Sequence, residues 1–167
     1  YGYINGAGRY YRGADFQTGA RFLTDNAGDF FVNLSIAYVD DERRSDTPGD
    51  PYVTIMEQER RLRSRSYLSA SWTKNDWAAG VSTSRIGSMN YQSPRWDGKP
   101  NTKIDPYYDI GAFVRYDIED GHYVALSVSN LMDDVPKKNS DLGWPWFATY
   151  YYSPVGRELF LTYRYTF

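Results

Sequence analysis

The chain of 167 residues carries 19 Lys and Arg against 21 Asp and Glu, a net charge of −2. It therefore lacks the basic excess with which nucleic-acid-binding proteins neutralise phosphates. The absence of cysteine excludes a disulfide scaffold, a thiolate metal site and a cysteine nucleophile. No run approaches the roughly 18 consecutive apolar residues of a transmembrane helix, whereas a membrane-crossing strand needs apolar residues only at alternate positions.

Aromatic residues make up 18% of the chain, and 17 of them are tyrosines. Tyr and Trp concentrate where one end of a ring is dry and the other is wet, as at the boundary of a membrane. A soluble carbohydrate-binding domain is rich in the same residues, so composition alone leaves both classes open. The length predicts a single domain.

The first predicted hairpin follows a Gly- and Tyr-rich start. Residues 1–13 are interpreted as the end of a preceding strand or as a loop. Apolar residues then alternate with polar ones over residues 14–22 and again over residues 30–38, with a turn-rich connection between them. Alternation is lost over residues 40–61, which predicts a long loop.

The second predicted hairpin spans residues 66–72 and 77–84, joined by a tight turn. Trp72 and Trp77 flank this turn and are expected at the same end of the hairpin. Residues 88–105 are polar and contain prolines, which predicts a second long connection.

The third predicted hairpin is formed by residues 109–117 and 123–129, with a turn at residues 119–121. A third long connection, residues 135–156, precedes a final predicted strand, residues 157–167. One parity of that strand is apolar or aromatic throughout: Leu159, Leu161, Tyr163, Tyr165 and Phe167. It resembles the assembly signal with which bacterial outer-membrane barrels commonly end.

About seven strands are therefore expected, joined alternately by short turns and long loops, with no helical period. Outer-membrane barrels have this asymmetry, with short periplasmic turns and long extracellular loops. A soluble sandwich has no reason to sort its loops by length so regularly. The predicted fold class is all-β, an antiparallel transmembrane β-barrel segment.

The end of the chain resembles a particular family. TonB-dependent outer-membrane receptors usually end their penultimate strand in Asn-Leu-Phe-Asp and open their last strand with Gly-Arg. The matching residues here are Asn130, Leu131, Asp133, Gly156 and Arg157, with Met132 in place of the usual Phe. Residues 12–16 similarly resemble a stretch that opens an earlier strand in that family.

The resemblance implies that residues 1–167 are the carboxyl-terminal part of one barrel of about 22 strands whose lumen holds a plug domain absent from this chain. It implies a receptor of the bacterial outer membrane that imports a scarce solute such as a ferric siderophore, cobalamin or a glycan. The implied partners are the rest of the barrel, the plug, the TonB energy-transducing complex, the barrel-assembly machinery, and outer-membrane lipid with lipopolysaccharide. The alternatives are a small autonomous barrel and a soluble, aromatic-rich, carbohydrate-binding β domain.

Aromatic residues in the last long connection are the predicted ligand-binding residues, because rigid rings offer stacking faces. They are Trp144, Trp146, Phe147, Tyr150, Tyr151 and Tyr152. An interface girdle or packing between loops would explain them equally well.

No catalytic constellation, metal site or cofactor is predicted, and the chain is not expected to be an enzyme. The single histidine, His122, is interpreted as a solvated turn residue, and the acidic run at residues 40–42 as a solvated loop. Four arginines form either a charged rim or a contact with lipopolysaccharide phosphates: Arg60, Arg61, Arg63 and Arg65.

Overall fold

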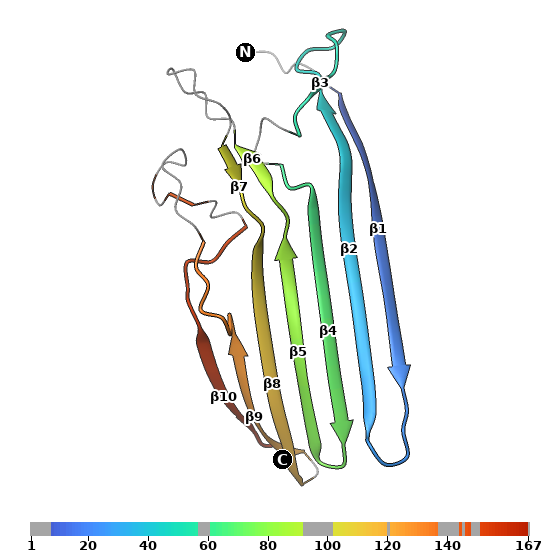
Figure 1. Ribbon diagram of the computed structural model, residues 1–167, viewed down its shortest axis with the longest axis vertical. Coiled ribbons are helices and arrows are strands. Elements are labelled where there is room, and N and C mark those ends of the chain that lie inside the picture. Colours follow the sequence, from blue (N-terminus) through green and yellow to red (C-terminus); the bar gives the residue numbers. More distant parts are fainter. Residues whose placement is uncertain are drawn as a thin grey trace.

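The computed structural model describes residues 8–56, 61–91, 102–119, 121–136, 144, 146–147 and 151–166, and within them the chain is all-β (Figure 1). The strands are β1 (Arg9–Phe22), β2 (Asp29–Arg44), β3 (Val53–Thr54), β4 (Ser64–Lys74), β5 (Trp77–Ile86), β6 (Met89–Tyr91), β7 (Thr102–Ile104), β8 (Tyr107–Glu119), β9 (His122–Ser129) and β10 (Glu158–Arg164). The described residues contain no helix that is long and apolar enough to cross a membrane.

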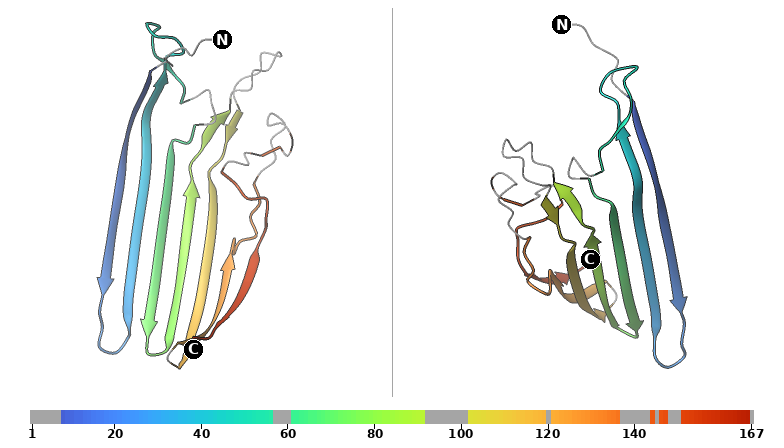
Figure 2. Two further views of the ribbon diagram at one scale, coloured as in Figure 1. Left: turned by 180° about the vertical axis from the view of Figure 1, so that it is seen from behind. Right: turned by 45° about the horizontal axis from the view of Figure 1, so that its top comes forward.

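Seven strands form one antiparallel sheet in the order β1-β2-β4-β5-β8-β9-β10. The short strand β3 pairs with the end of β2, and β6 pairs with β7. The prediction of an all-β, antiparallel segment of about seven strands is thus confirmed. The sheet is curled but open, and β1 and β10 are its two edges (Figure 2). Six antiparallel pairings lead from β1 to β10, so the two edge strands run in the same direction.

All three predicted hairpins are present, as β1–β2, β4–β5 and β8–β9. Their short turns lie at one end of the sheet, called here the turn end, and the long connections lie at the opposite, loop end (Figure 1). The first turn is held against β4 because the Trp72 indole donates a hydrogen bond of 2.7 Å to the Ala27 carbonyl. Gly28 adopts a φ of 91° in this turn, and a Cβ there would lie 2.4 Å from the Thr73 carbonyl oxygen.

The first hairpin is longer than predicted at its loop end. Residues 9–13 belong to β1 and residues 40–44 to β2, and β3 lies inside the segment predicted to be a loop. Charged side chains on both faces erase the alternation here, but the ladder of backbone pairs continues to Arg9 and Arg44. A bulge separates Arg12 from Gly13 and leaves Asp40 as an extra residue on β2.

Two other predicted boundaries are wrong. The connection predicted over residues 88–105 contains the paired strands β6 and β7. The final strand, predicted over residues 157–167, is β10 and covers only Glu158–Arg164. The predicted Phe167 of the assembly signal lies outside the described residues.

Candidate functional site

One face of the sheet is polar and lined by small side chains. Strands that pair in register bring alternate positions of each strand to the same face. Ser69 on β4 is aligned with Ser82 on β5 and Gly111 on β8, and Tyr67 is aligned with Ser84 and Asp109. These residues line a groove of about 650 Å³, together with Phe113 and Phe160. This polar face offers hydroxyl groups and a few aromatic rings.

The opposite face is apolar. Rows of aliphatic side chains cross it in register, one of which runs through Val114, Leu126 and Leu161. Leu126 is 49% exposed and Leu161 is 77% exposed, so no described segment covers this face. Large apolar side chains exposed on it include Phe16, Phe22, Phe30, Ile36, Leu68, Val81, Val114, Leu126, Leu159, Leu161 and Tyr163.

The apolar face is a slanted band rather than a horizontal one. At the loop end the first polar residue on this face is Arg12 on β1, Ser66 on β4 and Arg85 on β5. Ser66 and Arg85 are aligned with each other and lie about four residues lower in the register than Arg12. At the turn end the aromatic boundary steps down in the same direction, from Phe22 on β1 to Trp77 on β5. Both boundaries therefore run obliquely to the strands.

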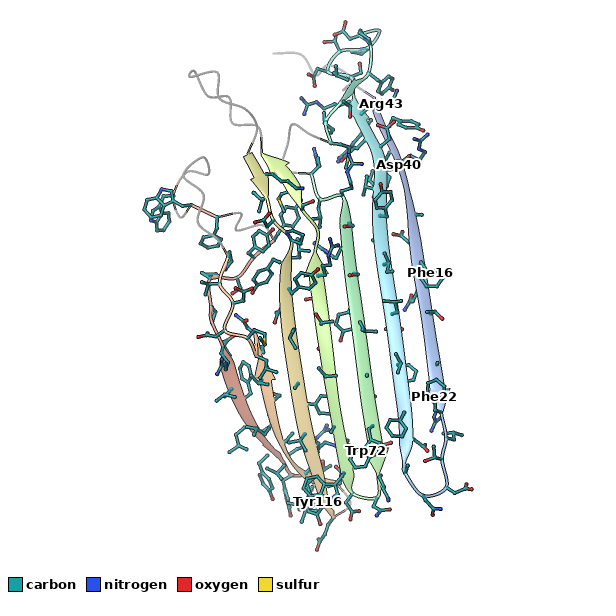
Figure 3. The ribbon with its side chains drawn as sticks, in the orientation of Figure 1. Phe16, Phe22, Asp40, Arg43, Trp72 and Tyr116 are labelled. Carbon is teal, nitrogen blue, oxygen red and sulfur yellow. The ribbon has the colours of Figure 1, made fainter. Side chains whose placement is uncertain are left out.

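Aromatic side chains gather at the turn end of the band. Figure 3 shows Phe22, Trp72 and Tyr116 near this end, and the rings of Trp77 and Tyr116 lie 4.7 Å apart. Trp72 and Trp77 lie at the same end of the β4–β5 hairpin, as predicted, and the register also places them on the same face. His122 packs edge-on against Tyr165, with 4.2 Å between ring centroids.

Five of the six predicted ligand-binding aromatics are described, and they differ in exposure. Trp144 is 82% exposed and Trp146 is 44% exposed. Phe147 and Tyr151 instead pack against a buried pair, Met89 and Tyr152. Tyr150 lies outside the described residues.

This buried pair ties the last connection to the loop end of the sheet. Tyr152 is only 6% exposed, and its ring lies 5.2 Å from that of Tyr107 at the start of β8. Leu62, Ile86 and Ile104 also pack against Met89 and Tyr152. Phe147, Tyr151 and Tyr152 thus take part in packing between loops, which is one of the alternatives that the sequence left open. Trp144 and Trp146 are exposed.

The Tyr152 hydroxyl is buried and has no hydrogen-bond partner within the described part of the chain. Burial raises the pKa of Tyr152, and the neighbouring Tyr151 raises it further. A buried hydroxyl that lacks a partner destabilises the fold, because it has lost its hydrogen bonds to water.

The residues that carry the family resemblance form a hydrogen-bonded cluster between the end of β9 and the start of β10. Asn130 has a φ of 47° and exchanges two hydrogen bonds with the backbone of Asp134, of 2.7 and 2.9 Å. Its own N–H donates to the Asp109 carboxylate at 3.0 Å. Asn130 therefore ends β9 and directs the chain away from the sheet.

The second half of the motif completes this cluster. The Arg157 N–H donates to the Asp133 carboxylate at 2.8 Å. A Cβ at Gly156 would lie 2.6 Å from the same carboxylate oxygen, so any larger residue here would displace the Asp133 side chain. The motif residues 24 positions apart are thus brought together, while Leu131 is exposed. Their spacing has a structural reason, the docking of β10 onto β9.

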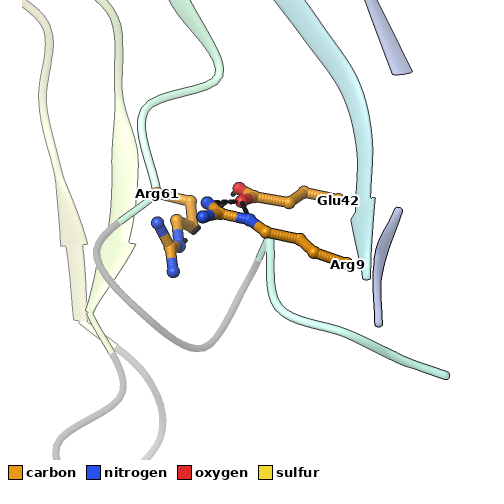
Figure 4. A network of polar contacts seen from close by, with 3 residues as sticks. All are labelled: Arg9, Glu42 and Arg61. Carbon is orange, nitrogen blue, oxygen red and sulfur yellow. Dashed lines mark hydrogen bonds and ion pairs between the residues drawn. The ribbon is translucent and has the colours of Figure 1, made fainter. Parts of the chain in front are cut away.

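A buried carboxylate joins three segments at the loop end, a feature that sequence reasoning missed. Glu42 is 3% exposed and accepts hydrogen bonds from Arg9, of which the Nε bond is 2.6 Å (Figure 4). Arg61 lies 3.6 Å from the other Glu42 oxygen. Asp40 and Asp41, interpreted as a solvated loop, are on β2 and pair with arginines.

Arg61, Arg63 and Arg65 are the arginines of the expected rim that the structure describes. Arg61 pairs with Glu42, and Arg65 is aligned with Ala37 and Ile86 on the polar face. Arg61 is thus paired with a carboxylate. Arg60 lies outside the described residues.

Comparisons with known proteins do not assign this chain to a family. No protein-family model matches this chain, and a search of curated proteins found no significant match.

Proposed function

We propose that this chain is part of an outer-membrane β-barrel of the TonB-dependent receptor type, which imports a scarce solute across the bacterial outer membrane. The observation that carries the proposal is the uncovered apolar face opposite a polar, small-residue groove. In this arrangement the apolar face contacts lipid and the polar face lines the lumen.

The size of the apolar face favours lipid over water. Seven strands spaced about 4.8 Å apart are about 29 Å wide, and residues 30–38 span about 26 Å along β2. The projected area is therefore roughly 750 Å², whereas soluble monomers rarely expose apolar patches above about 300–600 Å². The oblique boundaries of the band support the same conclusion, because barrel strands cross a membrane at a tilt of about 35–45°.

The open edges bear on the partners of this segment. Unpaired backbone groups in lipid cost several kcal/mol each, so β1 and β10 require neighbouring strands. The rest of one barrel would supply them, and a plug domain would fill the lumen beside the polar face. The TonB complex, the barrel-assembly machinery and outer-membrane lipid are the other proposed partners, and the solute is a ferric siderophore, cobalamin or a glycan.

Two alternatives remain as outcomes of the test. A small autonomous barrel would need to pair β1 with β10, yet these edges run in the same direction and would meet as a parallel seam in an otherwise antiparallel sheet. A soluble carbohydrate-binding domain is favoured by one observation, the 82% exposure of Trp144, because an exposed indole is a stacking face for a sugar.

Tryptophan quenching separates these proposals. Two single-tryptophan variants are inserted into vesicles, one retaining Trp77 on the apolar band and one retaining Trp144 at the loop end. Brominated lipid should quench Trp77 strongly, and aqueous acrylamide should quench Trp144. Quenching of Trp77 by acrylamide alone would refute the membrane proposal.

The transport step needs its own measurement. Deleting the gene should abolish uptake of one solute, and deleting TonB should abolish the same uptake. Uptake that continues without TonB would overturn the receptor assignment while leaving the membrane location intact.

A further inference from the structure

Arg85 lies on the apolar face, at the boundary where the band ends toward the loop end. Its register partners are Ser66 on β4 and Tyr108 on β8. The next position toward the turn end on the same face is Thr83, which is aligned with Leu68 and Ile110. The guanidinium thus sits where apolar side chains give way to polar ones.

The described contacts of Arg85 are all with uncharged groups. Its Nε donates to the Tyr108 hydroxyl at 3.2 Å, and one terminal nitrogen donates to the Ser64 hydroxyl at 3.0 Å. Its Cζ lies 5.9 Å from the centre of the Tyr108 ring. Within the described residues, no carboxylate balances this positive charge.

Two other arginines near the same boundary differ in this respect. Arg12 pairs with Asp40 at 2.7 Å, and Arg43 pairs with Asp41 at 2.7 Å (Figure 3 labels Asp40 and Arg43). Their charges are balanced by neighbouring side chains. Arg85 is therefore the arginine of this group that is best placed to attract an anion.

The surroundings of Arg85 are hydroxyl-rich and open. Ser64 and Ser66 have small side chains. The residue aligned with Ser64 on β2 is Tyr38, which is 41% exposed. Tyr108 is 50% exposed. One tyrosine and two serines thus lie beside the guanidinium at the edge of an apolar surface, and Tyr38 is one strand further away.

We infer that Arg85, with Ser64, Ser66 and Tyr108, binds the phosphorylated sugar headgroup of a lipopolysaccharide-type lipid whose acyl chains cover the apolar band. A guanidinium recognises phosphate through paired N–H donors. The hydroxyls and the Tyr108 ring match a sugar rather than a simple glycerol headgroup. The position of the site at the band's edge places it level with lipid headgroups. This inference rests on the proposed membrane location.

The test measures which lipid stays with the protein. Wild-type chain, Arg85→Gln and the control Arg12→Gln are inserted into phosphatidylcholine vesicles that contain bisphosphorylated lipid A. Parallel vesicles contain dephosphorylated lipid A or phosphatidylglycerol. The lipid retained after detergent extraction and affinity purification is quantified. The control makes the same change of charge at a boundary arginine that already has a carboxylate partner.

Wild type and Arg12→Gln should retain bisphosphorylated lipid A about tenfold better than Arg85→Gln, the effect of losing one charge-assisted hydrogen bond. Equal retention by wild type and Arg85→Gln would overturn the site. Retention of phosphatidylglycerol at the level of lipid A would overturn its assignment to a phosphosugar. If brominated lipid quenches Trp77 in the variant that retains only this tryptophan, either failure concerns only this site, whereas absence of that quenching would remove the proposed function as well.

Discussion

Replacing Leu126 with arginine tests the assignment of the two faces. Leu126 is 49% exposed on β9, and its register partners are Val114 and Leu161, so the new charge would enter the apolar band. An arginine near the middle of a bilayer costs about 2–4 kcal/mol in a barrel strand. An exposed substitution in a soluble domain changes stability by only about 0.5 kcal/mol. The two environments therefore predict different results from one variant.

Ser127→Arg is the matched control. Ser127 is the next residue of the same strand, but it lines the groove on the polar face. A charge there would face water in a lumen, where a substitution is tolerated. The two variants thus differ by one position in the chain and by the face that carries the charge.

The assay is urea unfolding of protein inserted in lipid vesicles, followed by tryptophan fluorescence. Leu126→Arg should lower the folded-to-unfolded ratio roughly 30- to 700-fold, while Ser127→Arg should leave it nearly unchanged. Equal midpoints for Leu126→Arg and wild type in lipid would refute the assignment of this face to the membrane. So would a wild-type chain that stays monomeric in buffer without detergent.

Three further substitutions test the loop end. Tyr152→Phe removes a buried hydroxyl without a described partner, so the free energy of unfolding in urea should stay equal or rise by about 1 kcal/mol. Because burial raises the Tyr152 pKa, the unfolded chain loses this proton first, and wild-type stability should fall above about pH 10 more steeply than that of Tyr152→Phe in a pH series. Asn130→Ala removes the two bonds to Asp134 and should speed hydrogen exchange at β10 amides, with β1 amides as the unaffected control. Glu42→Gln removes the charge that pairs with Arg9 and should lower the free energy of unfolding in urea by about 1–2 kcal/mol. The loss stays this small because half-exposed Arg9 regains hydrogen bonds to water, and no loss at all would show that the network adds no stability.

The alternation of side chains determined the fold class and the two faces. Leu126 and Ser127 differ in polarity and lie one residue apart, so a strand must place them on opposite sides. Short connections, such as the turn at residues 23–28, predicted which strands pair. These patterns are local, because each depends on residues that are close in the chain.

Only the tertiary structure decided the arrangement at the loop end. Arg9 and Glu42 are 33 residues apart, and their pairing extends β1 and β2 through a stretch whose charges hide the strand period. Tyr152 is buried because Met89, from a different connection, packs against it. Among the described residues, Arg85 has no carboxylate neighbour whereas Arg12 has one, and this difference also follows from register across strands. Contacts of this kind depend on segments that only folding brings together, and local periodicity carries no record of them.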